Sequence, residues 1–111
     1  MRSFLIDEIS PENLDKVEAW LKEQELGSAI DKLYHFPLPP KLLTPMQQEH
    51  ATACGPFYMA VETGHDWIKL ELLVRAKNIL RCACIAYATP EQQEHMTSYL
   101  ESLLTDLGIP L

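Results

Sequence analysis

The clearest pattern in the chain is an alternation of apolar and polar side chains over residues 66–76. The apolar positions are Ile68, Leu70, Leu72 and Val74. The charged positions between them are Lys69, Glu71 and Arg75. Period-two alternation is typical of a strand that covers a core with one face. Apolar segments on either side, 57–63 and 80–88, predict two further strands, so we expect an antiparallel meander with turns at Gly64 and at Lys77–Asn78. We expect Gly64 to adopt positive φ in the first turn.

Two longer segments have the apolar spacing of amphipathic helices. The first begins at Ser10-Pro11, and its apolar stripe is Leu14, Val17 and Leu21. The second begins at Thr89-Pro90, and its apolar positions are Met96, Tyr99, Leu100, Leu103, Leu104 and Leu107. A Ser or Thr cap followed by proline is a typical helix start, and glycines at positions 27 and 108 are the expected left-handed stops. A shorter helix is predicted from Thr44-Pro45 to Cys54, with Gln47 completing a capping box.

Two more strands are expected near the beginning of the chain, over residues 3–9 and 30–36. The predicted order is β-α-β-short α-β-β-β-α. This order indicates a two-layer α+β fold with a five-stranded, mainly antiparallel sheet and two amphipathic helices on one face. A chain of 111 residues is the size of one domain, so we expect residues 1–111 to form a single α+β domain.

The charge of the chain narrows the classes of partner. The formal net charge is −7, from 9 basic and 16 acidic residues, and no basic cluster is present. Because nucleic acids and anionic membranes repel such a chain, we expect neither as a partner. No apolar run approaches the ~18 residues that a membrane helix needs. The first residues include acids too early for a signal peptide, so we expect a cytoplasmic protein.

The outer face of the predicted meander is unusually apolar. Its residues are Trp67, Leu73, Ala83, Ile85 and Tyr87. Exposed surfaces of this kind usually mark a binding site, and a twofold interface is the commonest way to cover one. We therefore favour a small non-catalytic interaction or regulatory domain, homodimeric through this face and without a cofactor.

The alternative is a zinc protein with a Cys3His site made of His50, Cys54, Cys82 and Cys84. His50 and Cys54 are one helical turn apart. Cys82 and Cys84 would share a strand face, where residues i and i+2 lie ~6.6 Å apart, whereas two thiolates on one tetrahedral zinc lie ~3.8 Å apart. The strand would have to bulge for both to bind. Otherwise the cysteines are small buried hydrophobes, which is a common role for free cysteine.

Enzymatic activity has the least support from the sequence. The phosphate-binding, nucleophile-elbow and zinc-protease motifs are absent. An active site would have to use His50, Cys54, or His65 with Asp66, and the sequence places no nucleophile beside a base. We therefore favour a non-catalytic protein.

Overall fold

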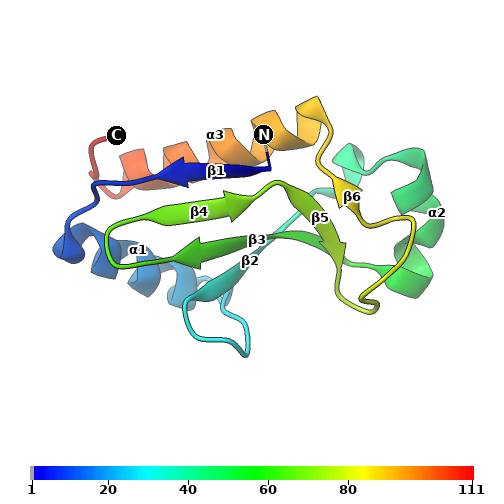
Figure 1. The fold of residues 1–111 in the computed structure, drawn as a ribbon, viewed down its shortest axis with the longest axis horizontal. Helices are drawn as coiled ribbons and strands as arrows, with labels where there is room; N and C mark the ends of the chain where they lie inside the picture. The colour runs from blue at the N-terminus through cyan, green and yellow to red at the C-terminus, as the bar shows by residue number, and fades with distance from the viewer. Residues whose placement is uncertain (1) are drawn as a thin grey trace.

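The computed structural model describes residues 2–111 and contains a six-stranded antiparallel sheet with three α-helices (Figure 1). β3 (Phe57–Thr63) is central. It pairs with β2 (Leu33–Pro37) along one edge, and with β4 (Ile68–Glu71) and β5 (Leu73–Ala76) along the other. β1 (Ser3–Ile6) pairs with β4, and β6 (Ala86–Tyr87) pairs with β5. The expected α+β architecture is confirmed, with six strands in place of five.

The two long helices, α1 (Pro11–Glu23) and α3 (Pro90–Asp106), lie behind the sheet in Figure 1 and leave its other face open. Their buried residues include the predicted positions Leu14, Val17 and Leu21 of α1 and Met96, Leu100, Leu103 and Leu104 of α3. The core therefore lies between the helices and one face of the sheet. No helix in residues 2–111 has the length and apolar character needed to cross a membrane.

The alternating segment forms two strands instead of one. Its four apolar positions, Ile68, Leu70, Leu72 and Val74, are all buried as predicted. Leu72 interrupts the ladder with β3. Its N–H donates to the carbonyl of Arg2, and its own carbonyl accepts from the N–H of Ala88. This break turns β5 away from β1 and toward β6, which explains the additional strand.

The prediction of a third meander strand over residues 80–88 is wrong. Only Ala86–Tyr87 pair as a strand. After β5 the chain leaves the sheet because Lys77 N–H donates to Pro56 O and Asn78 N–H donates to Cys54 O. These bonds attach the segment 77–85, which we call the ligand loop, to the end of α2 (Pro45–Cys54).

The helix starts follow the predicted caps. Ser10, Thr44 and Thr89 each accept a hydrogen bond from the backbone N–H three residues later, and the boxes at Thr44 and Thr89 are complete. A short 3-10 helix, η1 (Pro40–Leu42), precedes α2. Gly108 has φ +76° as expected, but Gly27 does not have positive φ. The left-handed residue after α1 is Glu25, so α1 ends earlier than predicted.

Gly64 is required for a different reason from the one expected. It does not adopt positive φ. A Cβ at this position would lie 2.0 Å from the Trp67 ring, so the indole occupies the space that any other residue would need. The hairpin between β3 and β4 is thus fixed by the packing of Trp67 against a bare backbone.

Candidate metal centre

Helix α2 supplies two of the predicted zinc ligands. His50 and Cys54 are four residues apart and therefore lie on one face of the helix. The Thr44–Gln47 capping box fixes the first turn of α2. At its other end, a Cβ on Gly55 would lie 2.7 Å from Ala51 O, so the chain passes too close to the helix for any larger residue. The sequence thus positions both ends of the helix that carries His50 and Cys54.

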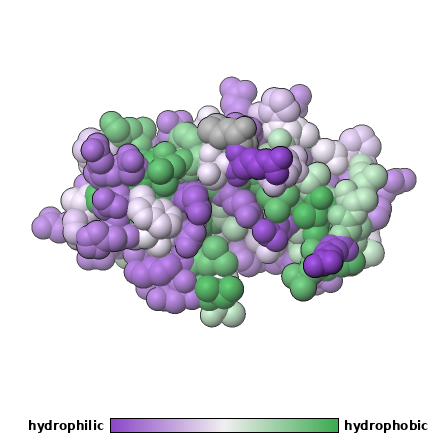
Figure 2. Space-filling model, viewed as in Figure 1, coloured by the Kyte–Doolittle hydropathy of each residue, from purple (hydrophilic) through white to green (hydrophobic). Residues whose placement is uncertain are grey.

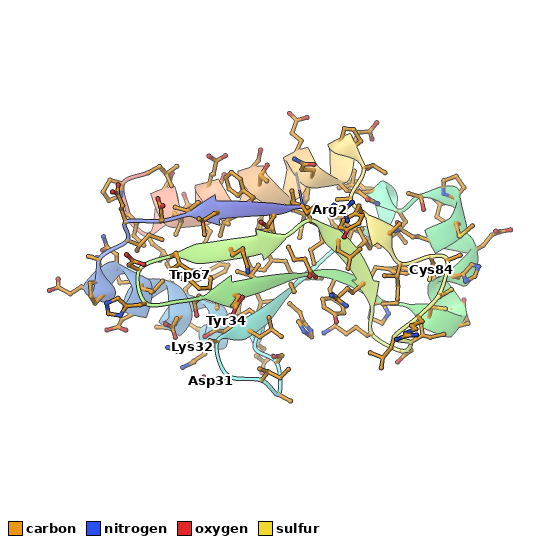
Figure 3. The ribbon with its side chains drawn as sticks, viewed as in Figure 1. Arg2, Asp31, Lys32, Tyr34, Trp67 and Cys84 are labelled. Atoms are coloured by element: carbon orange, nitrogen blue, oxygen red, sulfur yellow. The ribbon has the colours of Figure 1, made fainter. Side chains whose placement is uncertain are left out.

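The ligand loop supplies Cys82 and Cys84. Asn78 attaches this loop to α2, because its side-chain Nδ2 donates to Gly55 O at 2.6 Å. The loop then turns tightly at Cys82: Ile85 N–H donates to Cys82 O, and Cys84 N–H donates to Cys82 Sγ at 3.5 Å. Figure 3 shows Cys84 where this loop passes α2, at one end of the sheet.

The four predicted ligands converge. One ligand atom from each of His50, Cys54, Cys82 and Cys84 lies within 4.8 Å of the others. Cys82 Sγ lies 3.2 Å from His50 Nδ1 and 3.9 Å from Cys54 Sγ. Cys54 Sγ lies 3.8 Å from His50 Nδ1. Within residues 2–111 this is the one group of three or more His, Cys, Asp or Glu side chains positioned to hold a metal ion.

These distances fit a tetrahedral zinc ion. Ligand bonds of ~2.3 Å to sulfur and ~2.0 Å to nitrogen place two sulfurs ~3.8 Å apart, and a sulfur and a nitrogen ~3.6 Å apart. The three observed separations of 3.2, 3.8 and 3.9 Å are close to these values. The objection based on strand spacing does not apply, because Cys82 and Cys84 lie in a turn and not in a strand.

Burial and hydrogen bonding shift the pKa values of Cys82 and Cys84 in opposite directions. Cys54 and Cys84 are buried, and Cys82 is partly exposed. The backbone N–H of Cys84 and its thiol donate to Cys82 and lower the pKa of Cys82 to about 7. Burial, followed by the hydrogen bonds to Cys82 and Cys54, raises the pKa of Cys84 to about 12. A bound cation would relieve this cost by neutralising thiolates that otherwise face one another.

A buried amide network supports the ligand loop, and the sequence did not reveal it. Gln47 Nε2 donates to Cys84 O at 3.2 Å, and Gln92 Nε2 donates to Gln47 Oε1 at 3.0 Å. Gln92 also donates to Leu42 O at 2.8 Å. Both glutamines are capping-box residues that would ordinarily face solvent, yet they are 2% and 0% exposed. The capping boxes were visible in the sequence, but their burial depends on how α2 and α3 meet.

The residues of the predicted dimer face are only partly brought together. Trp67, Leu73 and Tyr87 lie on the open face of the sheet, where Leu73 and Tyr87 are paired across β5 and β6. Ala83 and Ile85 lie in the ligand loop, and Ile85 packs against the core. The alternation expected for a strand over 80–88 is therefore absent, and these five residues do not form one continuous surface of a sheet.

The open face is also more polar than the sequence suggested. Arg75 pairs with Glu71 at 2.7 Å, and Lys69 lies 3.5 Å from Glu62. The Arg2 guanidinium lies over the Tyr87 ring. Figure 2 shows hydrophilic and hydrophobic residues interspersed over this side of the molecule. The homodimer through this face stays a prediction.

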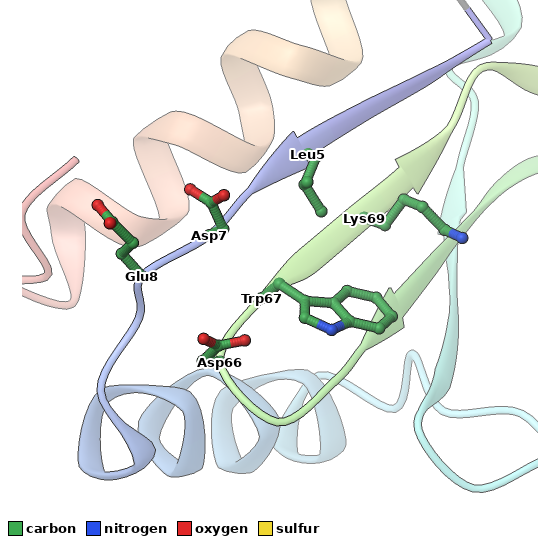
Figure 4. A pocket seen from close by; sticks show the side chains of 6 residues that line it. All are labelled: Leu5, Asp7, Glu8, Asp66, Trp67 and Lys69. Atoms are coloured by element: carbon green, nitrogen blue, oxygen red, sulfur yellow. The ribbon is translucent and has the colours of Figure 1, made fainter.

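The other candidate residues lie away from the His50 cluster. Asp66 lines a hollow of about 360 Å³ together with Asp7, Glu8 and the Trp67 ring (Figure 4). His65 lines a different hollow, beside Asp15 and Glu18. His65 and Asp66 therefore do not converge on one cavity, and neither joins His50 or Cys54.

Comparisons with known proteins gave no guide to function. No protein-family model, no curated protein and no solved structure matches the chain.

Proposed function

We propose that this protein binds one zinc ion through His50 Nδ1 and the thiolates of Cys54, Cys82 and Cys84, and that the ion is structural. The observation that carries this proposal is the convergence of four ligand atoms from two segments within 4.8 Å of one another. Three thiolates and one imidazole are a typical donor set of structural zinc.

The number of protein ligands favours a structural over a catalytic role. Catalytic zinc sites keep one position for water or substrate, whereas structural sites are closed by four protein ligands. Here four ligands are available, and two of them, Cys54 and Cys84, are 5% and 1% exposed. A fully ligated ion at this position has no coordination site left for a substrate.

The composition of α2 gives the ion a structural task. Among the ten residues of this helix only Gln47 and Cys54 are buried, so α2 has almost no apolar stripe. Helices in proteins are held mainly by packing an apolar face. A zinc ion bound by His50 and Cys54 on one side, and by the ligand loop on the other, would join α2 to the loop without such a face.

Cobalt(II) substitution tests the donor set directly. Metal-free, reduced protein titrated with Co²⁺ should develop the intense visible absorption of tetrahedral thiolate-bound cobalt, saturate at one equivalent, and lose this absorption when zinc is added. His50→Asn should weaken the binding of both cobalt and zinc. His95→Gln is the matched control, because His95 lies on α3 outside the cluster. Weak octahedral-type absorption in the wild type, or equal behaviour of the two variants, would refute the proposed ligands.

A further inference from the structure

Two of the three cysteines contact each other from different segments of the fold. Cys54 Sγ, at the end of α2, lies 3.9 Å from Cys82 Sγ in the ligand loop. Twenty-eight residues separate them in the sequence. Cys84 is only two residues from Cys82, and a disulfide between such neighbours closes a very small ring. Cys54 and Cys84 are 5% and 1% exposed, so a pair of these two has no sulfur that solvent reaches readily. The pair poised for a disulfide is therefore Cys54 with the partly exposed Cys82.

The two sulfurs differ in their access to solvent. Cys54 is 5% exposed, whereas Cys82 is partly exposed at the surface of the ligand loop. Cys82 Sγ also accepts the N–H of Cys84 and lies 3.2 Å from His50 Nδ1. A small oxidant from solvent therefore reaches the Cys82 sulfur first. The buried Cys54 sulfur, 3.9 Å away, is then placed to act as the resolving thiol.

We propose that this zinc site is also a redox switch, in which hydrogen peroxide joins Cys54 to Cys82 and thereby releases the zinc ion. The proposal rests on the zinc binding proposed above. In addition to the structural role, it states that the metal leaves on oxidation, because the disulfide removes two of the four ligands at once.

The oxidation proceeds in two balanced steps. The Cys82 sulfur attacks one oxygen of hydrogen peroxide, the O–O bond breaks, and hydroxide leaves, which makes Cys82 a sulfenic acid. The Cys54 thiolate then attacks Cys82 Sγ, the S–O bond breaks, and a second hydroxide leaves as the disulfide forms. Two thiolates are oxidised and one peroxide is reduced. The two hydroxides take two protons from the medium and become water.

Oxidation leaves the metal with an incomplete site. Only His50 and Cys84 keep free donor atoms, and a two-ligand site holds zinc far more weakly than a closed four-ligand site. The disulfide still joins the end of α2 to the ligand loop. The switch therefore exchanges a metal crosslink for a covalent one and frees His50 and Cys84.

The test uses the zinc-loaded chain without reductant. One equivalent of hydrogen peroxide should release one zinc per chain to a chromogenic chelator, and the resulting metal-free chain should weigh two hydrogens less than the reduced metal-free chain. Peptide mapping should recover Cys54 linked to Cys82, and dithiothreitol should restore zinc binding. Zinc retained under these conditions, or released with Cys82 as a sulfinic acid and no disulfide, would overturn the switch.

Two variants separate this inference from general oxidative damage. Cys84→Ser keeps the reacting pair and should still form the Cys54–Cys82 disulfide. Cys54→Ser removes the resolving thiol and should stop at oxidised monothiol forms. A Cys82–Cys84 disulfide in the wild type would overturn the assignment of the pair. A chain that takes up no zinc before oxidation would refute the proposed function itself, so the two failures are distinguishable.

Discussion

Gln47 Nε2 donates a hydrogen bond to the backbone carbonyl of Cys84 across a distance of 3.2 Å. This bond links the first turn of α2 to the ligand loop, whereas His50 and Cys54 approach the loop from the later turns of the same helix. Gln47 Oε1 in turn accepts from Thr44 N–H and from Gln92 Nε2. The capping boxes of α2 and α3 and the candidate metal centre therefore share one buried network.

Removing the Gln47 amide should weaken both the fold and metal binding. Gln47→Ala removes the partner of Cys84 O and of Thr44 N–H, and leaves Gln92 Nε2 with only its bond to Leu42 O. Because unsatisfied buried polar groups cost about 1–3 kcal/mol each, we expect the free energy of unfolding to fall by about 2–4 kcal/mol. Supporting residues around metal ligands are typically worth a 10- to 100-fold change in affinity, so zinc binding should weaken by about that factor.

Urea unfolding and chelator competition for zinc measure these two effects. Gln48→Ala is the control, since the neighbouring Gln48 is exposed and its side chain donates a hydrogen bond only to Leu43 O. Equal zinc affinity in Gln47→Ala and Gln48→Ala would contradict a supporting role for the network.

Removal of zinc should loosen one end of the molecule only. The core includes Cys54 and Cys84, but its other members are apolar side chains outside the candidate centre, whereas α2 buries only Gln47 and Cys54. Backbone amides of 45–54 and of the ligand loop should exchange with deuterium at least ~10-fold faster in the metal-free protein, and those of β3 and β4 should be unchanged. Hydrogen-exchange mass spectrometry resolves these segments. Faster exchange spread evenly over the chain would show that the ion does not act locally.

The candidate centre should also be sensitive to the close approach at Gly55. Gly55→Ala places a Cβ 2.7 Å from Ala51 O, and because that atom belongs to the backbone, the last turn of α2 must move and Cys54 with it. We expect a loss of about 1–3 kcal/mol in stability together with weaker zinc binding. Gly27→Ala is the control, because nothing lies within 4 Å of its added Cβ. Thermal unfolding with and without zinc compares the two variants. Equal losses of stability in Gly55→Ala and Gly27→Ala would contradict the importance of the close approach at Gly55.

Zinc affinity should rise with pH between about 6 and 8, since metal binding competes with protons for thiolates and imidazole. Burial and the neighbouring thiols raise the pKa of Cys84 to about 12 in the metal-free fold, so this thiol still holds its proton at neutral pH and must release it on binding. The zinc-bound form carries fewer protons, and raising the pH therefore favours it. Calorimetric titration in buffers of different ionisation enthalpy should detect at least one proton released per zinc at pH 8. Proton-neutral binding would exclude Cys84 as a ligand.

The sequence predicted the fold where local patterns and tertiary packing agree. The alternation over 66–76 and the capped helices beginning at Ser10 and Thr89 were correct because their apolar faces meet the same core. The segment 80–88 was wrong because its apolar alternation resembles a strand, while the backbone bonds of Lys77 and Asn78 to the end of α2 divert the chain. Periodicity carries no information about such long-range bonds.

The incorrect strand prediction also made the geometry of the candidate centre look unfavourable for zinc. All four ligands could be named from residue type and spacing, but a strand would have kept Cys82 and Cys84 too far apart. The turn that brings their sulfurs together depends on Cys84 N–H bonding Cys82 Sγ and on Asn78 reaching Gly55. The burial of Gln47 and Gln92 likewise follows from the meeting of two helices and has no signal in either helix alone.

Native mass spectrometry of the reduced chain with one equivalent of zinc is the decisive test of the metal centre. We expect one zinc per chain in the wild type, its loss on acidification, and no stoichiometric zinc in Cys82→Ser. The same spectrum reports whether the chain is a homodimer. A wild-type spectrum without zinc, recorded with all three thiols reduced, would contradict the metal centre.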